Sequence, residues 1–324
     1  MIMYLCYNYI IGDIVKAKAF KTLDEQVEIL KNKGMIVDDY DFAKSVLLRE
    51  NYFFLNGYRG LFFKSPNDRM FIPGTSFREL YAVFTFDRLI RNIFFKNILI
   101  IENNIKSIFS YHLSKKYGIR EKNYLNPNNF NNDSSKSRQI NDLLKKMKRQ
   151  IRVNGSQHSA TMHYLTNYGY IPLWIVVKVL SFGIVSELYS ILKVDDQKDI
   201  AAIYDIESEE LIIYLLVLAN YRNKCAHEDI LFDHRTQREI TDTKFHHFLN
   251  IPLMDGEYIY GKDDIFSLVI IMKEMLLEDE FNLLIAEIRY EIDKLSGKLS
   301  TIEIGKVLDS MGFPMNYYDL ARME

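Results

Sequence analysis

The sequence predicts an all-α protein, and three observations support that fold class. Glycine and proline, the residues that most often interrupt helices, number only 14 and 6 in 324 residues. Hydrophobic residues make up 48% of the chain, which is enough for a substantial core. Along most of the chain these residues recur at helical spacing, so helices are expected over most of its length.

The first expected elements lie before residue 118. Residues 23–50 predict two short helices, the second beginning after capping aspartates. The aromatic stretch 51–63, NYFFLNGYRGLFF, fits a strand pair or a packed loop, and its periodicity does not decide between them. Ser76 and Glu79 have the spacing of a capping box, which predicts the start of a helix that continues to Gly118.

The rest of the chain is also expected to be helical after a loop or hinge at 120–135, which is Asn-rich and lacks an apolar period. The expected helices occupy residues 136–152, 172–192, 208–227, 262–278, 280–296 and 301–311. The apolar run from Tyr170 contains Lys178 and Glu187, which favours a buried helical hairpin over a membrane span.

These elements suggest three regions. Residues 1–75 form an N-terminal helical and aromatic segment, residues 76–235 a helical core, and residues 236–324 a C-terminal helical segment. The core contains the Asn-rich loop and the amphipathic helix 136–152.

The charge balance excludes a globally basic nucleic-acid-binding protein. Lys and Arg total 41 against 43 Asp and Glu, so any RNA-binding surface must be local. The basic helix 136–152 is either an ordinary solvated face or such a surface, and the two readings have equal support. Its candidate RNA-binding residues are Lys145, Lys146, Lys148, Arg149 and Arg152.

The cysteines and the N-terminus indicate a cytoplasmic protein. Cys6 and Cys225 have neither the spacing of a zinc site nor that of a disulfide framework, which fits a reducing compartment. The apolar first residues lack the basic region and the small-residue cleavage site of a signal peptide. No transmembrane segment is expected.

The stretch LANYRNKCAHEDILFDH, residues 218–234, places Arg222, Asn223 and His227 at the end of an apolar helix. Imidazole titrates near neutral pH and can move a proton, whereas guanidinium stays charged and grips phosphate oxygens in a fork. Metal-independent RNA cleavage needs a base for the 2′-hydroxyl, an acid for the leaving 5′-oxygen and a cation over the phosphate, and these two groups meet those needs. Asn223 is one turn before His227 and shares its face, so it is a candidate to orient the imidazole or a phosphate oxygen.

Two alternatives to catalysis stay open for this Arg–Asn–His box. Cations in the last turn of a helix commonly cap its free carbonyls, and that reading predicts a buried His227 bonded to a backbone carbonyl. Alternatively, the box grips RNA or a protein partner without cutting, as in a sensor of infection. A catalytic reading further predicts a homodimer, because transesterification uses one imidazole as base and a second as acid.

The box resembles the R-N-x-x-A-H motif of the Abi-like proteins of bacterial abortive infection, the AbiD/AbiF group, whose helical fold belongs to the HEPN superfamily of ribonucleases. The resemblance extends from about Lys18 to Tyr318 and is carried by further segments in the same order. These include LDEQVEILKNKGMIVDDYDFAKSVLLRENYFFLNGY, GTSFRELYAVFTFDRLIRNIFFKNILIIENNIKSIFSYHLSKKYG, IPLWIVVKVLSFGIVSELYSIL and MGFPMNYY.

The resemblance implies a HEPN-type bundle with additional N- and C-terminal helices, and an endoribonuclease that acts as a toxin in phage defence. It implies that Arg222 and His227 are catalytic, with Asn223 beside them, and that a structured noncoding RNA is the antitoxin. Glu102 matches a recurring acidic position and is either a helix salt bridge or an auxiliary acid. The chain departs from the pattern at Lys178, where a glutamate is common, and at Glu228, where a second histidine is common.

No metal site, cofactor, membrane or DNA partner is expected. His158 and His163, like the pair His246 and His247, lack the third ligand and the spacing that a zinc site needs, and His112 is read as a packing or surface residue. No nucleotide-binding or esterase motif is present. The aromatics of the stretch 51–63 are read as core or, alternatively, as base-stacking residues. They are Tyr52, Phe53, Phe54, Tyr58, Phe62 and Phe63.

Overall fold

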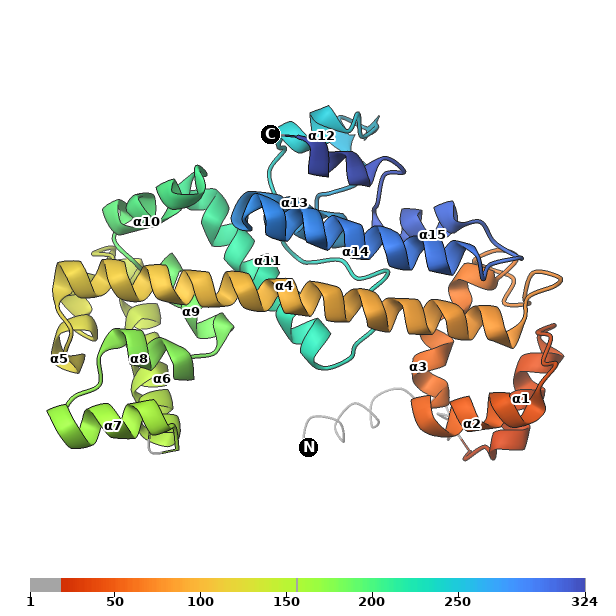
Figure 1. Cartoon of the computed structure of the whole chain (residues 1–324), viewed down its shortest axis with the longest axis horizontal. Helices are drawn as coiled ribbons and strands as arrows, with labels where there is room; N and C mark the ends of the chain where they lie inside the picture. Colours follow the sequence, from red (N-terminus) through yellow and green to blue (C-terminus); the bar gives the residue numbers. More distant parts are fainter. Residues whose placement is uncertain (1–18, 156, 324) are drawn as a thin grey trace, which may run out of the picture. The chain divides into compact units, whose positions relative to one another are not determined.

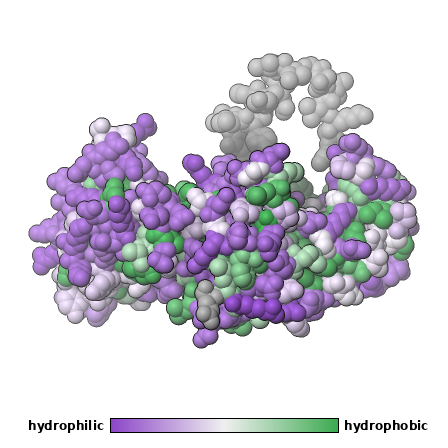
Figure 2. Space-filling model, turned by 90° about the horizontal axis from the view of Figure 1, so that it is seen from above, coloured by the Kyte–Doolittle hydropathy of each residue, from purple (hydrophilic) through white to green (hydrophobic). Residues whose placement is uncertain are grey.

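The computed structural model describes residues 19–155 and 157–323, and its helices confirm the all-α prediction (Figure 1). Within these residues the only strands are β1 (Leu253–Met254) and β2 (Glu257–Tyr258), which pair antiparallel. Cys6 and the apolar first residues lie outside the described part of the chain. Over the face seen in Figure 2, hydrophilic residues predominate, and hydrophobic residues gather in separate patches.

The chain divides into two compact units, one ending at Leu80 and the other beginning at Tyr81, whereas the sequence suggested breaks after residues 75 and 235. The helices of the first unit are α1 (Leu23–Asn32), α2 (Tyr40–Glu50), α3 (Tyr52–Asn56) and the short 3-10 helix η2 (Gly57–Phe62). The helix pair expected within residues 23–50 is therefore present. Asp39 caps α2 by accepting a hydrogen bond from the backbone N–H of Phe42, at 2.9 Å.

The aromatic stretch 51–63 is mostly helical, so both the strand pair and the packed loop were wrong. α3 and η2 turn successive aromatic rings to different sides, because side chains on a helix spread around its axis. Tyr58 and Phe62 are buried, as a core role requires, but Phe53 is 72% exposed. Phe54 is also exposed, so the core interpretation holds for only part of the set.

The long helix α4 (Phe77–Tyr117) begins at the predicted capping box. The backbone N–H of Ser76 donates to Glu79 at 3.2 Å, and that of Glu79 donates back to the Ser76 hydroxyl at 3.2 Å. Beyond the first turn, the buried side of α4 carries large apolar residues at steps of three or four. They are Ile90, Phe94, Ile98, Ile101, Ile105 and Phe109.

The second unit contains the rest of α4, from Tyr81 on, and a series of shorter helices. In chain order they are α5 (Glu121–Tyr124), η3 (Pro127–Asn129), η4 (Ser134–Lys136), α6 (Ser137–Gly155), α7 (Ser159–Tyr168), α8 (Leu173–Val179), α9 (Phe182–Ser190), α10 (Val194–Ala201), η5 (Ala202–Tyr204), α11 (Ser208–Ala226), α12 (Lys244–Phe248), α13 (Ile265–Met275), α14 (Glu278–Ser296), α15 (Ile304–Met311) and η6 (Tyr317–Arg322). The segment 172–192, expected to form a buried helical hairpin, contains the two helices α8 and α9, and both pack against α6. Among the helices of the described residues, none has the length and apolarity that crossing a bilayer demands.

The Asn-rich segment 120–135 is more ordered than a hinge. It forms short helices and buries Tyr124 and Phe130, and the Tyr124 hydroxyl donates to the carbonyl of Ile171 at 2.8 Å. The apolar period is missing because these helices are too short to repeat it. The segment therefore fastens the end of α4 to the start of α8.

Candidate functional site

The Arg–Asn–His box occupies the end of α11, and a hydrogen-bonded turn closes this end. The backbone N–H of Asp229 donates to the carbonyl of Lys224 at 3.2 Å, and that of Glu228 donates to Cys225 at 3.5 Å. This is the pattern of a Schellman motif, in which the residue after the C-cap takes a left-handed conformation. Glu228 occupies that position with φ 54°, and His227 is the C-cap residue.

The side chain of His227 is exposed and makes no side-chain hydrogen bond within the described residues. Its backbone N–H donates to the carbonyl of Asn223 at 3.1 Å, which fixes the backbone beneath the ring. The capping alternative predicts a buried imidazole bonded to a carbonyl, and the geometry disagrees with it. His227 therefore presents its ring to solvent from a defined backbone position.

Arg222 is held from the opposite helix. Its Nε lies 3.6 Å from Oε2 of Glu102 on α4, and its guanidinium carbon lies 5.8 Å from the centre of the Phe95 ring. The Arg222 side chain is one-third exposed, and within the described residues its terminal nitrogens make no hydrogen bond. One side of the guanidinium is thus anchored, while the fork remains available to an anion.

Glu102 is a buried carboxylate between two cations. Its side chain is 9% exposed, and Oε1 accepts a hydrogen bond from Lys106 Nζ at 2.7 Å. Oε2, which faces Arg222, has no hydrogen-bond partner within the described residues. The position of Glu102 is compatible with both interpretations from the sequence, a helix salt bridge and an auxiliary acid. It forms a salt bridge within α4 and also lies beside the box. The partner Lys106 was missed, although its i,i+4 spacing from Glu102 was a usable signal.

A second ion pair holds the chain that follows the box. Arg91 and Asp87, both nearly inaccessible, lie 2.6 Å apart on α4. Arg91 also donates to the carbonyl of Asp229 at 2.8 Å, and Asp87 accepts from the backbone N–H of Leu231 at 3.2 Å. These bonds connect α4 to the turn after His227. Sequence inspection did not find them, because only the fold brings residues so distant in the chain together.

The contacts set the direction of α11 along α4. Arg222 is opposite Glu102 and Asp229 is opposite Arg91, so the chain from Arg222 onward passes α4 toward the N-terminus of α4, and His227 lies between these two contacts in the chain. In Figure 1, α11 crosses α4 obliquely. Asn223 is exposed, and no side-chain contact joins it to Arg222 or His227 within the described residues. The box is therefore a set of neighbouring groups that do not bond to one another.

The predicted RNA-binding cations are on α6 and are all exposed. Lys146 pairs with Glu187 on α9 at 2.8 Å, and Lys145 lies 3.6 Å from Asp142. The opposite side of α6 is apolar and buried through Ile140, Leu143, Leu144 and Met147. Within the described residues no contact joins these cations to Arg222 or His227, and their exposure fits both interpretations of the basic helix.

Beside Glu102, a cavity of about 570 Å³ lies between α4 and α8. Its lining includes Glu102, Lys106 and Trp174, together with Lys178, the residue that departs from the family pattern. His158, half-buried before α7, also lines it, and its Nδ1 has no hydrogen-bond partner within the described residues. Neither Lys178 nor His158 was assigned a site role from the sequence.

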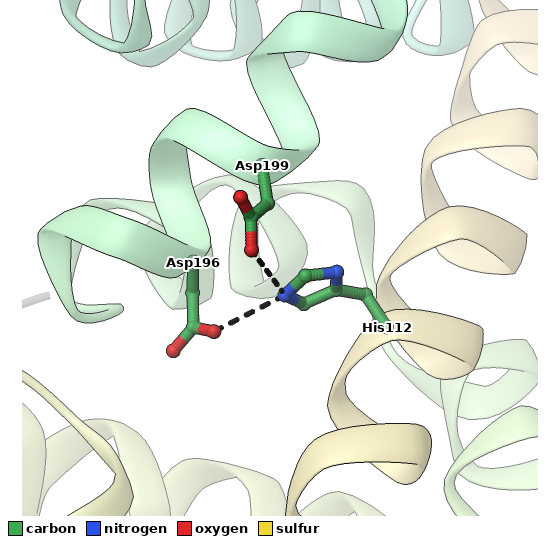
Figure 3. A group of neighbouring side chains, drawn as sticks. All are labelled: His112, Asp196 and Asp199. Atoms are coloured by element: carbon green, nitrogen blue, oxygen red, sulfur yellow. Dashed lines mark hydrogen bonds and ion pairs between the residues drawn. The ribbon is translucent and has the colours of Figure 1, made fainter.

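A metal-ligand geometry occurs elsewhere, at His112, Asp196 and Asp199 (Figure 3). His112 Nε2 lies 3.1 Å from Asp196 Oδ1, but the same carboxylate also accepts from Lys116 at 2.6 Å and Tyr117 at 2.6 Å. Burial acts to raise the pKa of Asp196, yet these hydrogen bonds outweigh burial and lower the pKa. The carboxylate already has a cation and two further partners, so the cluster is an ion-pair network between α4 and α10.

The remaining histidines have structural surroundings. His246 is fully buried, with Nδ1 2.9 Å from the Thr243 hydroxyl and Nε2 3.1 Å from the carbonyl of Gly261. Burial lowers the pKa of His246, so it stays neutral. His247 and His163 are exposed. The interpretation of His112 as a packing or surface residue is corrected, because His112 belongs to the buried Asp196 network.

The fold and the box together define an all-α protein that presents an anchored arginine and an exposed histidine at one helix end. The model of the Abi-like protein family matches residues 45–233, a span that contains α4, Glu102 and the whole box. The chain belongs to this family, and membership suggests a role in abortive infection, a defence against phage. No curated protein and no solved structure matches the chain.

Proposed function

We propose that this protein is a metal-independent endoribonuclease of the HEPN type that acts in the cytoplasm as an abortive-infection or toxin effector. The observation that carries the proposal is the anchored Arg222, whose free fork lies five residues before an exposed His227. Guanidinium can stabilise the charge on a pentavalent phosphate, and imidazole can serve as a general base or a general acid.

The reaction is an internal transesterification. His227 takes the proton of a ribose 2′-hydroxyl, and the 2′-oxygen attacks the adjacent phosphorus. The bond from phosphorus to the 5′-oxygen then breaks, and a second imidazole donates a proton to the leaving oxygen. The products are a 2′,3′-cyclic phosphate and a 5′-hydroxyl. Arg222 contacts the phosphate, and Asn223 orients either the imidazole or a phosphate oxygen.

The second imidazole comes from a second copy of the chain. A two-fold homodimer places two boxes face to face and so supplies one base and one acid. The proposed antitoxin is a structured noncoding RNA that covers the two facing boxes, because it would hold the enzyme inactive until infection. Lys145, Lys146, Lys148, Arg149 and Arg152 are available to contact either RNA through its phosphates.

The test is incubation with total RNA and labelled tRNA in EDTA. Wild type should cut, and the fragments should end in 2′,3′-cyclic phosphate, whereas His227→Ala should leave the RNA intact. The matched control is His247→Ala, which removes another exposed histidine and should cut like wild type. Cleavage retained by His227→Ala overturns the assignment. If wild type leaves the RNA intact but binds it in a salt-sensitive way, the protein is instead a non-catalytic sensor of RNA or protein.

A further inference from the structure

A stripe of residues on α4 lines two adjoining cavities. It repeats every three or four positions, so it follows one side of the helix. Its members are Leu99, Glu102, Asn103, Lys106, Ser107, Ser110, Tyr111, Ser114 and Lys115. The cavity beside Glu102 measures about 570 Å³, and the next one along α4 measures about 450 Å³.

The two cavities form one groove, because both are lined by Ser107, Ser110 and Trp174. From Leu99 to Lys115 the groove follows α4 for roughly 24 Å, given the helical rise per residue. Trp174 on α8 forms the opposite wall, and it is 38% exposed. Its ring packs edge-on against Tyr164 at 6.5 Å, which holds it in place.

The lining has the chemistry of a site for single-stranded nucleic acid. Three lysines face one carboxylate, since Lys106, Lys115 and Lys178 share the groove with Glu102. Trp174 offers a ring face on which a base can stack, whereas the exposed Tyr111 ring has Lys115 Nζ over it, 6.0 Å from the ring centre. Lys178 is exposed and has no ion-pair partner within the described residues, so its charge is available to a phosphate.

Unpartnered polar atoms also gather here. Three buried atoms without a hydrogen-bond partner in the described residues belong to groove residues, namely Glu102 Oε2, His158 Nδ1 and Ser114 Oγ. Such atoms are rare in native proteins and often mark functional sites. Arg222 Nε also lacks a hydrogen bond, but it lies 3.6 Å from Glu102 Oε2 and forms an ion pair with it, so His158 Nδ1 and Ser114 Oγ are the two atoms of this group without a partner in the described residues.

The groove adjoins the box through Glu102. Glu102 lines its first cavity and also holds Arg222, while His227 lies on the other side of Arg222 along α4. We infer that this groove binds the single-stranded part of the RNA substrate on one side of the cut, with a base stacked on Trp174 and phosphates on Lys115 and Lys178. This inference rests on the proposed ribonuclease function.

Trp174 is the only tryptophan of the chain, so its emission reports groove occupancy directly. The probe is a labelled 2′-O-methyl RNA octamer, which cannot undergo attack by a 2′-hydroxyl. Binding is followed by the anisotropy of the label and by Trp174 fluorescence. Wild type and His227→Ala should bind alike, with quenching of Trp174 that weakens as salt is added.

Lys115→Ala combined with Lys178→Ala should weaken binding by about tenfold. The matched control combines Lys298→Ala, in the turn after α14, with Lys306→Ala on α15, which removes two exposed lysines from the C-terminal region and should leave binding unchanged. Equal weakening by both double variants, or octamer binding that leaves Trp174 emission unchanged, overturns the inference.

The same proteins separate this inference from the proposed function. If the octamer quenches Trp174 but natural RNA stays intact, the groove stands and the nuclease assignment fails. If natural RNA is cut through His227 and the Lys115/Lys178 variant has an unchanged KM, the nuclease stands and the groove assignment fails.

Discussion

Arg222 Nε lies 3.6 Å from Glu102 Oε2, and this contact joins the last turn of α11 to the middle of α4. Because Glu102 is buried and also binds Lys106 at 2.7 Å, its carboxylate is a fixed point against which the arginine is oriented. The arginine fork is therefore held in place before any phosphate arrives, and an aligned cation contributes more to catalysis than a mobile one.

Glu102→Gln should slow RNA cleavage. The amide keeps the shape of the carboxylate but not its charge, so Arg222 loses its anchor, and we expect kcat to fall roughly tenfold to a hundredfold with little change in KM. Initial rates over a range of RNA concentrations measure both constants. The control is Glu287→Gln, which removes the acid of the Lys96–Glu287 pair on another side of α4. Equal kinetics for the two variants would remove Glu102 from the site.

Asp87→Asn should destabilise the protein. Asp87 and Arg91 are 1% and 3% exposed, and loss of one charge leaves the other buried without its partner. We expect the free energy of unfolding to fall by about 3 kcal/mol. Urea denaturation measures the change, and Asp142→Asn, in an exposed ion pair on α6, should change stability by less than about 0.5 kcal/mol. A loss below that figure for Asp87→Asn contradicts the prediction.

Glu228→Gly should stabilise the end of α11. Glu228 has φ 54°, a left-handed conformation that costs a residue with a Cβ about 1 kcal/mol more than glycine. We expect the urea midpoint to rise, with RNA cleavage unchanged. Glu228→Ala is the control, because it removes the same side chain without relieving the backbone. Equal midpoints for the alanine and glycine variants would show that the backbone conformation carries no strain.

Asp264→Asn should flatten the pH dependence of stability. Burial raises the pKa of Asp264 to about 7, whereas a carboxyl in an unfolded chain titrates near 4. Between these values the unfolded chain releases a proton that the folded chain keeps, so Asp264 makes stability fall as pH rises, by up to about 1.4 kcal/mol per pH unit. Asn carries no titrating proton but can still accept the N-cap hydrogen bond from Ser267.

The measurement for Asp264 is a series of urea midpoints at pH 5, 6 and 7 for wild type and variant. The difference between the two proteins isolates this carboxyl from other groups, such as His246, whose lowered pKa acts in the opposite direction by favouring the fold at higher pH. As pH rises, the stability of Asp264→Asn should increase relative to that of wild type. Parallel curves would place the pKa of Asp264 near its ordinary value.

Inactive chains should inhibit active ones if the proposed dimer supplies both imidazoles. At a fixed amount of wild type and with RNA in excess, added His227→Ala chains should lower the cleavage rate, because each mixed dimer contains only one imidazole. His247→Ala chains, added in the same amount, should raise the rate. A rate unaffected by His227→Ala, together with a monomeric mass in solution, contradicts the dimeric mechanism.

Part of the candidate site was accessible from the sequence because it is local. Arg222, Asn223 and His227 lie within two turns of one helix, so their proximity follows from the helix itself. Glu102 was found by resemblance, but its contact with Arg222 was not. The hydrogen bond from Arg91 to Asp229 joins positions that are far apart in the chain, and so does the groove between α4 and α8.

The helical class, the capping box at Ser76 and Glu79 and most helix positions could be predicted from the sequence alone, because hydrophobic period and caps are local properties. Tertiary structure decided that the stretch 51–63 is helical, because packing overrides weak local preference in short aromatic segments. It also decided which side of α4 meets the box and which side remains open as a groove. Those outcomes depend on how whole helices pack, which no single segment encodes.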